Sequence, residues 1–144
     1  MYSRIKYSLF SIFLLSISCS SPDAWDCVKT AGKTVSESRE PGFFNKIFIY
    51  DKLDLELIQS GEHRIEIHTG ENLLKGIETE VNNGRLRITN KNTCELLRNS
   101  DKTALIKVFF DTITNLEMFN SGYVRSVDTL FLDQFNLSKR SNGD

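Results

Sequence analysis

What this chain of 144 residues lacks already excludes several classes of protein. Only 8 glycines and 2 prolines occur, which excludes a collagen-like chain and a low-complexity disordered chain. The 18 basic residues are balanced by 19 acidic ones, so no excess of positive charge marks a general nucleic-acid binder. No apolar run reaches the ~18 residues that a transmembrane helix needs. The composition therefore predicts one small globular domain.

Signatures of common enzymes and metal sites are also missing. No Gly-x-Ser-x-Gly turn, phosphate-binding loop, dinucleotide fingerprint or Cys-x-x-Cys pair occurs. The two histidines, His63 and His68, are five positions apart and would point to opposite faces of one strand. Asp54 and Glu56 share a face and could in principle act in glycoside hydrolysis, but they alternate with leucines, so we interpret them as a solvated outer face. We expect no catalysis, no cofactor and no metal.

The first 18 residues have the pattern of an exported protein. Two basic residues, Arg4 and Lys6, precede an apolar stretch at 8–18, which has the length of a signal-peptide core. A buried helix of similar length is the alternative. The sequence LSISC at 15–19 is similar to a bacterial lipobox, in which the cysteine receives lipid before cleavage. We therefore predict a signal peptide at 1–18 and a triacylated Cys19 that anchors the protein to a membrane.

Export also bears on the three cysteines. If Cys19 carries lipid, Cys27 and Cys94 remain as a pair in an oxidising compartment, and we favour a disulfide between them over two free thiols. We expect Trp25 to pack near this bridge rather than to stack on a sugar. Ser20, and not aspartate, follows the first cysteine, which favours sorting to the outer membrane. The acidic remainder of the chain predicts no basic patch for anionic lipid, so the acyl chains would hold the anchor alone.

Alternation of apolar and polar residues begins after a polar segment at 19–42, which we interpret as a tether between membrane and domain. Ten phenylalanines and four tyrosines also favour strands. The alternation predicts half-buried strands. They lie at 47–50, 53–57, 64–68, 77–81 and 85–89.

The strongest local signal is Asn83-Gly84, which separates the last two of these runs and predicts a type I′ hairpin. A further strand at 104–110 has a partly continuous apolar run, so we expect burial on both of its faces. Phe109 and Phe110 of this run are interpreted as core residues rather than as a binding surface.

A weak repeat with a period of 21 residues follows. Leu116 lies six residues before Gly122, and Leu137 lies six residues before Gly143. This period is close to one coil of a parallel β-solenoid. Three short strands would make up one coil, at 116–119, 124–127 and 130–132. Because the second copy breaks off, we expect the solenoid to be incomplete at its C-terminus, with apolar side chains and a strand edge exposed. Closure of these strands into a small sandwich is the alternative.

Several segments resemble one family of bacterial envelope lipoproteins. They are DAWDC at 23–27, TAGK at 30–33, FNKI at 44–47, NLLKGI at 72–77 and LRITNKNTC at 86–94. The chain is thereby similar to the head GIN domain family, the auto-transporter adhesin heads of Bacteroidetes. The resemblance implies an all-β domain over 43–144, namely a right-handed parallel β-helix with an N-terminal β-meander, and it supplies no established activity. The segment ELLR at 95–98 departs from the family, which commonly has an aromatic there.

These observations predict a lipid-anchored protein of the cell envelope, at the outer membrane and on its periplasmic or exposed face. Its partners would be the membrane, through the anchor, and a glycan or an envelope protein along one face of the solenoid. A carbohydrate-active β-helix enzyme is the alternative. Such an enzyme would need carboxylates or basic residues recurring on one face, and no such recurrence is evident in the sequence.

Two threonines are candidates for O-glycosylation. Asp111-Thr112-Ile113 and Asp128-Thr129-Leu130 resemble the short Asp-Thr-apolar sequon of Bacteroidetes. Ordinary threonines at strand edges are the alternative for both Thr112 and Thr129.

Overall fold

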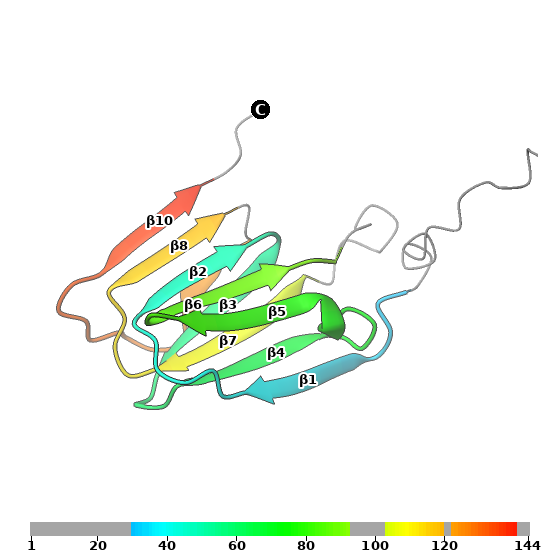
Figure 1. The fold of residues 1–144 in the computed structure, drawn as a ribbon, viewed down its shortest axis with the longest axis horizontal. Helices are drawn as coiled ribbons and strands as arrows, with labels where there is room; N and C mark the ends of the chain where they lie inside the picture. Colours follow the sequence, from blue (N-terminus) through cyan, green and yellow to red (C-terminus); the bar gives the residue numbers. More distant parts are fainter. Residues whose placement is uncertain (1–29, 93–102, 120–121, 141–144) are drawn as a thin grey trace, which may run out of the picture.

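Ten β-strands make up nearly all of the regular structure (Figure 1). The computed structural model describes residues 30–92, 103–119 and 122–140. The strands are β1 (Thr34–Arg39), β2 (Lys46–Tyr50), β3 (Leu53–Gln59), β4 (Arg64–Gly70), β5 (Ile77–Asn82), β6 (Arg85–Asn90), β7 (Ala104–Phe110), β8 (Asn115–Phe119), β9 (Val124–Ser126) and β10 (Asn136–Arg140). One short 3-10 helix, η3 (Leu74–Gly76), precedes β5. The all-β class expected from the sequence is confirmed.

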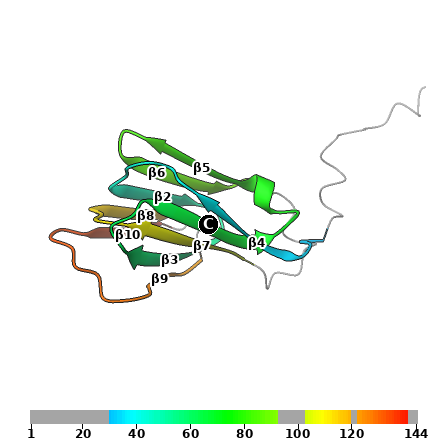
Figure 2. The same cartoon turned by 90° about the horizontal axis from the view of Figure 1, so that it is seen from below.

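The strands form two mixed, five-stranded sheets that lie over one another as two layers (Figure 2). Sheet A has the strand order β1-β4-β7-β3-β9, and sheet B has the order β10-β8-β2-β6-β5. In sheet A, β3 is parallel to β7 and to β9. In sheet B, β2 is parallel to β6 and β8, and β8 is parallel to β10. Antiparallel pairs are confined to one side of each sheet, where β1, β4 and β7 pair in turn and β5 pairs with β6.

The chain changes sheet between consecutive strands at several points. It passes from β2 in sheet B to β3 in sheet A, and Asp51, with a φ of 61°, lies at this crossing. The expected N-terminal meander is therefore wrong, because β2 and β3 are not neighbours in one sheet. The hairpin of β5 and β6 is confirmed: the strands are antiparallel, and Asn83 and Gly84 have φ of 50° and 72°. A type I′ turn requires positive φ at both central residues.

The 21-residue repeat corresponds to two strands that lie side by side, since Leu116 of β8 and Leu137 of β10 are register partners in a parallel pair. The strands expected at 116–119 and 124–127 overlap β8 and β9. The strand expected at 130–132 is wrong. Gln59 instead binds both backbone groups of Phe131, donating to its carbonyl oxygen at 3.0 Å and accepting from its amide nitrogen at 2.8 Å. One side chain thus replaces a partner strand here.

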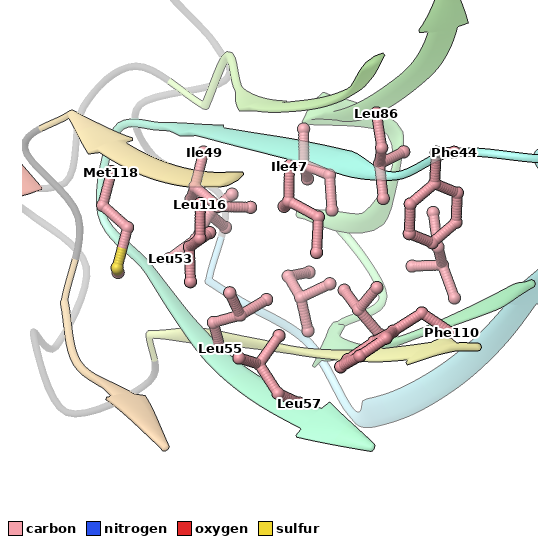
Figure 3. Close-up of a cluster of buried hydrophobic side chains, with 14 of the residues drawn as sticks. Phe44, Ile47, Ile49, Leu53, Leu55, Leu57, Leu86, Phe110, Leu116 and Met118 are labelled. Carbon is pink, nitrogen blue, oxygen red and sulfur yellow. The ribbon is translucent and has the colours of Figure 1, made fainter. Parts of the chain in front are cut away.

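The core lies between the two sheets and is lined mainly by alternate residues of strands β2 to β8. In Figure 3 the labelled side chains of β2 and β6 point toward those of β3 and β7. In β7 the burial alternates, so the expected burial of both faces is wrong. Phe110 is fully buried, whereas Phe109 lies half-buried on the outer face of sheet A. The largest fully buried side chains are Phe44, Phe110, Ile47, Ile49, Leu53, Leu55, Ile65, Ile67, Ile77, Leu86, Ile88 and Ile106.

Part of the segment interpreted as a tether contributes a strand, because β1 pairs antiparallel with β4 at the edge of sheet A. Its sequence lacks apolar alternation because its outward residues are exposed and its inward residues are mostly polar. Inward-pointing Arg39 crosses to the other sheet, where its Nη1 donates to the carbonyl oxygen of Ile77 at 2.8 Å and to Oγ1 of Thr79 at 3.2 Å. Backbone pairing and this contact hold β1, rather than apolar burial.

Candidate functional site

The outer face of sheet B gathers basic and aromatic side chains on neighbouring strands. β2 contributes Lys46, Phe48 and Tyr50, and its parallel neighbour β6 contributes Arg85 and Arg87. Successive side chains of a strand point to opposite faces, so the residues between these positions line the core and these five point away from it. We call this surface the Arg–aromatic face.

Four side chains on four adjacent strands of this face are stacked on one another. The guanidinium of Arg87 lies 4.5 Å from the ring centroid of Tyr50, and Tyr50 stacks on Phe119 with centroids 4.7 Å apart and planes at 3°. The guanidinium of Arg140 follows at 5.7 Å from the centroid of Phe119. Because β2 lies between β6 and β8, Tyr50 has Arg87 on one side and Phe119 on the other. Its ring faces are thus occupied, while the stacked guanidinium keeps N–H groups free to bind anions.

A pocket of about 560 Å³ opens on the Arg–aromatic face. All five residues that define the face line it, and the hairpin adds Glu80, Asn82 and Asn83. Arg85 lies over a second ring, with its guanidinium carbon 5.7 Å from the centroid of Phe48. The volume falls within the range of small-ligand pockets, about 300–1,000 Å³. Backbone pairing in sheet B therefore places cations, ring edges, amides and one carboxylate around a single pocket.

Unlike Lys91, which follows β6, and Arg140 of β10, the cations of this pocket have no acidic partner. Lys91 pairs with Glu78 at 2.7 Å, and Arg140 lies 4.0 Å from Glu117. Within the part of the chain that the structure describes, no carboxylate lies within 4.0 Å of Lys46, Arg85 or Arg87. Three unpaired cations against one carboxylate, Glu80, make this pocket locally positive.

This cluster could not be expected from the net charge, from which we predicted no basic patch for anionic lipid. Pairing between strands distant in sequence gathers three cations on one face. Lys46 and Arg85 are 39 positions apart and are register partners in the sheet. Sequence reasoning missed these residues. The available signal was that 46, 48, 50, 85 and 87 are the outward positions of two predicted strands, but nothing in the sequence showed that those strands pair.

The outer face of sheet A is also charged, but its charges neutralise one another. A row of register partners runs Glu66, Lys107, Glu56 and Arg125 across four strands. Nε of Arg125 donates to Oε1 of Glu56 at 2.9 Å, and Nζ of Lys107 lies 3.9 Å from its other carboxylate oxygen. The hydrogen bond and the charge of Glu56 raise the pKa of Arg125. We infer that this face is held together by ion pairs rather than open to an anion.

Glu66 shows the same compensation at the other end of this row. Partial burial acts to raise its pKa, but the hydrogen bond and charge of Arg64, followed by those of His68, lower the pKa below its ordinary value. Arg64 also lies over the ring of Phe109, 3.8 Å from its centroid.

The structure corrects the interpretation of Asp54 and Glu56 as a solvated pair. Glu56 is only 4% exposed because Arg125 and Lys107 cover it. Asp54 is engaged as well, since its Oδ1 accepts a hydrogen bond from the backbone amide of Tyr123 at 3.0 Å. Both carboxylates therefore have structural partners that tie β9 and the residues before it to β3.

The two histidines contact different neighbours. The ring of His63 lies 5.1 Å from that of Phe43 and 4.9 Å from that of Phe44, and its Nε2 is 3.1 Å from the carbonyl oxygen of Phe44. His68 lies on the outer face of sheet A, with Nε2 3.4 Å from Glu66. Across residues 30–92, 103–119 and 122–140, no group of three or more potential metal ligands comes together.

Of the remaining predicted sites, the two threonines lie among the described residues and the cysteines do not. Thr112 and Thr129 are both exposed and lie outside regular strands. Cys19, Cys27, Cys94 and Trp25 lie outside the described residues, as do the predicted signal peptide and lipidation site. Among the helices that the structure describes, none is long and apolar enough to span a membrane.

The described residues thus form an all-β domain of two facing sheets, with a pocket whose cations have no acidic partner. The family comparison is more specific: a family model described as "Putative auto-transporter adhesin, head GIN domain" matches residues 43–144. The chain belongs to this family, and the family recognised from sequence segments is confirmed.

Solved structures with a similar fold include proteins of Bacteroides and Parabacteroides. A putative adhesin from Bacteroides fragilis matches with a TM-score of 0.70 and 16% identity, over 78% of this chain and 52% of that one. A putative lipid binding protein from Parabacteroides distasonis matches with a TM-score of 0.62 and 19% identity, over 77% and 49%. The chain thus spans about half the length of these structures. At this identity the likeness establishes the fold alone. No curated protein matches the chain.

Proposed function

We propose that this protein is a lipid-anchored component of the cell envelope whose β-domain is an adhesin-like binding module. Cys19 would carry the anchor at the outer membrane, and the partner would be a glycan or an envelope protein. One observation carries the binding function: Lys46, Arg85 and Arg87 surround a pocket without an acidic partner, whereas the charged row on the outer face of sheet A is paired. Membership of an adhesin family supports the same function.

The parallel rows of strands support a right-handed β-helix as the finer architecture. The register offset between β2 and β8 equals that between β3 and β9, because Lys46 pairs with Asn115 and Leu55 pairs with Val124. Consecutive strands from opposite sheets therefore stack as units. In this proposal each unit is one coil, and β10 begins a further one.

The alternative of a carbohydrate-active enzyme is less well supported. Catalysis by paired carboxylates requires oxygens that can reach a substrate. Glu56 is covered by Arg125, and Asp54 accepts a backbone hydrogen bond. The pocket of the Arg–aromatic face holds a single carboxylate, Glu80. Its composition suits binding of a ligand better than hydrolysis.

Replacing the lipidated cysteine tests the anchor. We expect cells that express the wild-type protein to incorporate a palmitate analogue into it, and the Cys19→Ala variant to show no label and to leave the membrane fraction. Acyl chains supply the only membrane affinity that this proposal invokes. Cys27→Ala is the matched control and should label like the wild type. Equal labelling of Cys19→Ala and wild type would contradict the anchor.

Intact mass of protein purified from its own host tests the remaining modifications. We propose a Cys27–Cys94 disulfide and glycans on the exposed Thr112 and Thr129. Alkylation without reduction should leave both cysteines unmodified, and the glycans should add mass that Thr112→Val and Thr129→Val remove. Two alkylated thiols would contradict the disulfide, and an unmodified mass would contradict glycosylation.

A further inference from the structure

We propose that the pocket of the Arg–aromatic face binds an acidic glycan, through the carboxylate or sulfate groups of its sugars. This inference rests on the proposed binding function and names the ligand class of the same site. It follows from three properties of the pocket: its unpaired cations, its polar lining and its size.

The cations lie close enough to act on one ligand. Lys46 and Arg85 are register partners on adjacent parallel strands, which lie about 4.8 Å apart. Arg85 and Arg87 are two positions apart on β6 and so point to the same face, about 7 Å from each other. Guanidinium groups form paired hydrogen bonds with carboxylates and other oxyanions. The three cations, Lys46, Arg85 and Arg87, therefore fit a ligand that carries acidic groups on neighbouring sugar units.

The two guanidinium groups are already held by the sheet before any ligand arrives. Arg87 lies over Tyr50, and Arg85 lies over Phe48. Such stacking restricts the rotamers of long side chains, so less conformational entropy is lost on binding. Since Tyr50 is itself stacked between Arg87 and Phe119, its ring is not available as a platform for a neutral sugar. The geometry thus favours a charged glycan over a neutral one.

The rest of the lining favours a sugar over a lipid headgroup or an acidic protein. Asn82, Asn83 and Glu80 add amide and carboxylate groups, which can donate to and accept from hydroxyls. A site that binds a membrane surface would be expected to carry a protruding apolar side chain. The exposed large apolar residues that the structure describes do not line this pocket. A protein partner would need a far larger surface, about 800 Å² on each side. A short stretch of acidic sugar matches the pocket on each count.

The test uses the full-length protein in neutral detergent and five probes. Heparin supplies sulfate and uronate, polygalacturonate supplies carboxylate, dextran is neutral, and the soluble lipid headgroup glycerol phosphate and polyglutamate supply anions without sugars. Affinity is measured by isothermal titration calorimetry at two salt concentrations. We expect heparin or polygalacturonate to bind, and the affinity to fall as the salt concentration rises because the contacts are between charges.

Two double variants separate a specific site from general charge. Arg85→Gln/Arg87→Gln should weaken glycan binding by about tenfold or more, since each lost charge-assisted hydrogen bond costs more than a neutral one. Lys75→Gln/Lys91→Gln removes the same charge from two exposed lysines that do not line the pocket and should change affinity less than about threefold. Lys46→Gln is a single variant in which both stacked arginines remain. Thermal unfolding of each variant shows whether the fold is kept.

Several outcomes would overturn the inference. Equal losses in the two double variants would mean general attraction of charge, and equal binding of dextran would mean that acid groups are not recognised. Binding of glycerol phosphate or polyglutamate in place of both acidic glycans would assign the pocket to another ligand class. The inference can fail while the proposed function stands. This is the case if no probe binds, but Cys19→Ala still abolishes labelling and the wild type still binds an envelope protein. If Cys19→Ala labels normally, the anchor fails and the glycan result stands.

Discussion

Phe110→Ala is expected to destabilise the protein by about 3–5 kcal/mol, the usual cost of truncating a fully buried phenylalanine. The side chain is completely buried near the end of β7 and points into the space between the two sheets (Figure 3). Truncation would remove its apolar contacts and leave a cavity that the paired strands cannot close. Such a loss is a large fraction of the stability of a small domain. Urea unfolding followed by circular dichroism measures it.

Phe109→Ala is the matched control, since it is the same change one position earlier on the same strand. Phe109 is half-buried on the outer face of sheet A, where Arg64 lies over its ring. Loss of this contact should cost at most about 1.5 kcal/mol. A comparable cost for both variants would mean that the alternation of burial along β7 does not describe the protein in solution.

Leu116→Ala is expected to cost about 2–5 kcal/mol, again through a cavity in the core. Leu116 is completely buried, because β8 lies between β10 and β2 in sheet B and the side chain belongs to the core cluster. The equivalent position one repeat later, Leu137, is 54% exposed. The two leucines thus occupy corresponding places in neighbouring strands but differ in what surrounds them.

The same change at the repeated position provides the comparison. Leu137→Ala should alter the free energy of unfolding by less than about 0.5 kcal/mol, as expected for an exposed side chain. The difference between the two variants, measured by urea unfolding, reports how much of the burial depends on a neighbouring strand on each side. A large cost at Leu137 would show that β10 is covered in solution, by another chain or by residues outside those described.

Local sequence patterns predicted the faces of strands well and their partners poorly. Alternation correctly placed Leu53, Leu55 and Leu57 in the core, and Asn83-Gly84 correctly located the one hairpin predicted. Both signals depend only on residues close together in the chain. The 21-residue offset also located a real pair of strands, because it equals the sequence distance between register partners of β8 and β10.

The features that the sequence did not predict all depend on contacts between distant segments. Glu56 is buried because Arg125, 69 positions later, covers it. The strand expected at 130–132 is absent because Gln59 takes the backbone bonds of Phe131. The candidate site is of this kind as well, because two outward rows become one pocket only when β2 pairs with β6. Outward polar positions carry no apolar signal that would reveal their partners.

The position of β1 at the edge of sheet A determines how the domain responds to mechanical load. The chain enters β1 at Thr34, which pairs with Gly70 of β4, and the preceding Ala31 and Lys33 accept hydrogen bonds from the backbone amides of Asn72 and Glu71. A pull on the preceding residues, directed away from the sheet, loads one hydrogen-bonded pair at a time and peels β1 from that end. We expect peeling to meet its next barrier at Arg39, whose guanidinium is also bonded to Ile77 in the opposite sheet. Since β1 contributes no buried apolar side chain, we expect its detachment to leave the apolar core intact.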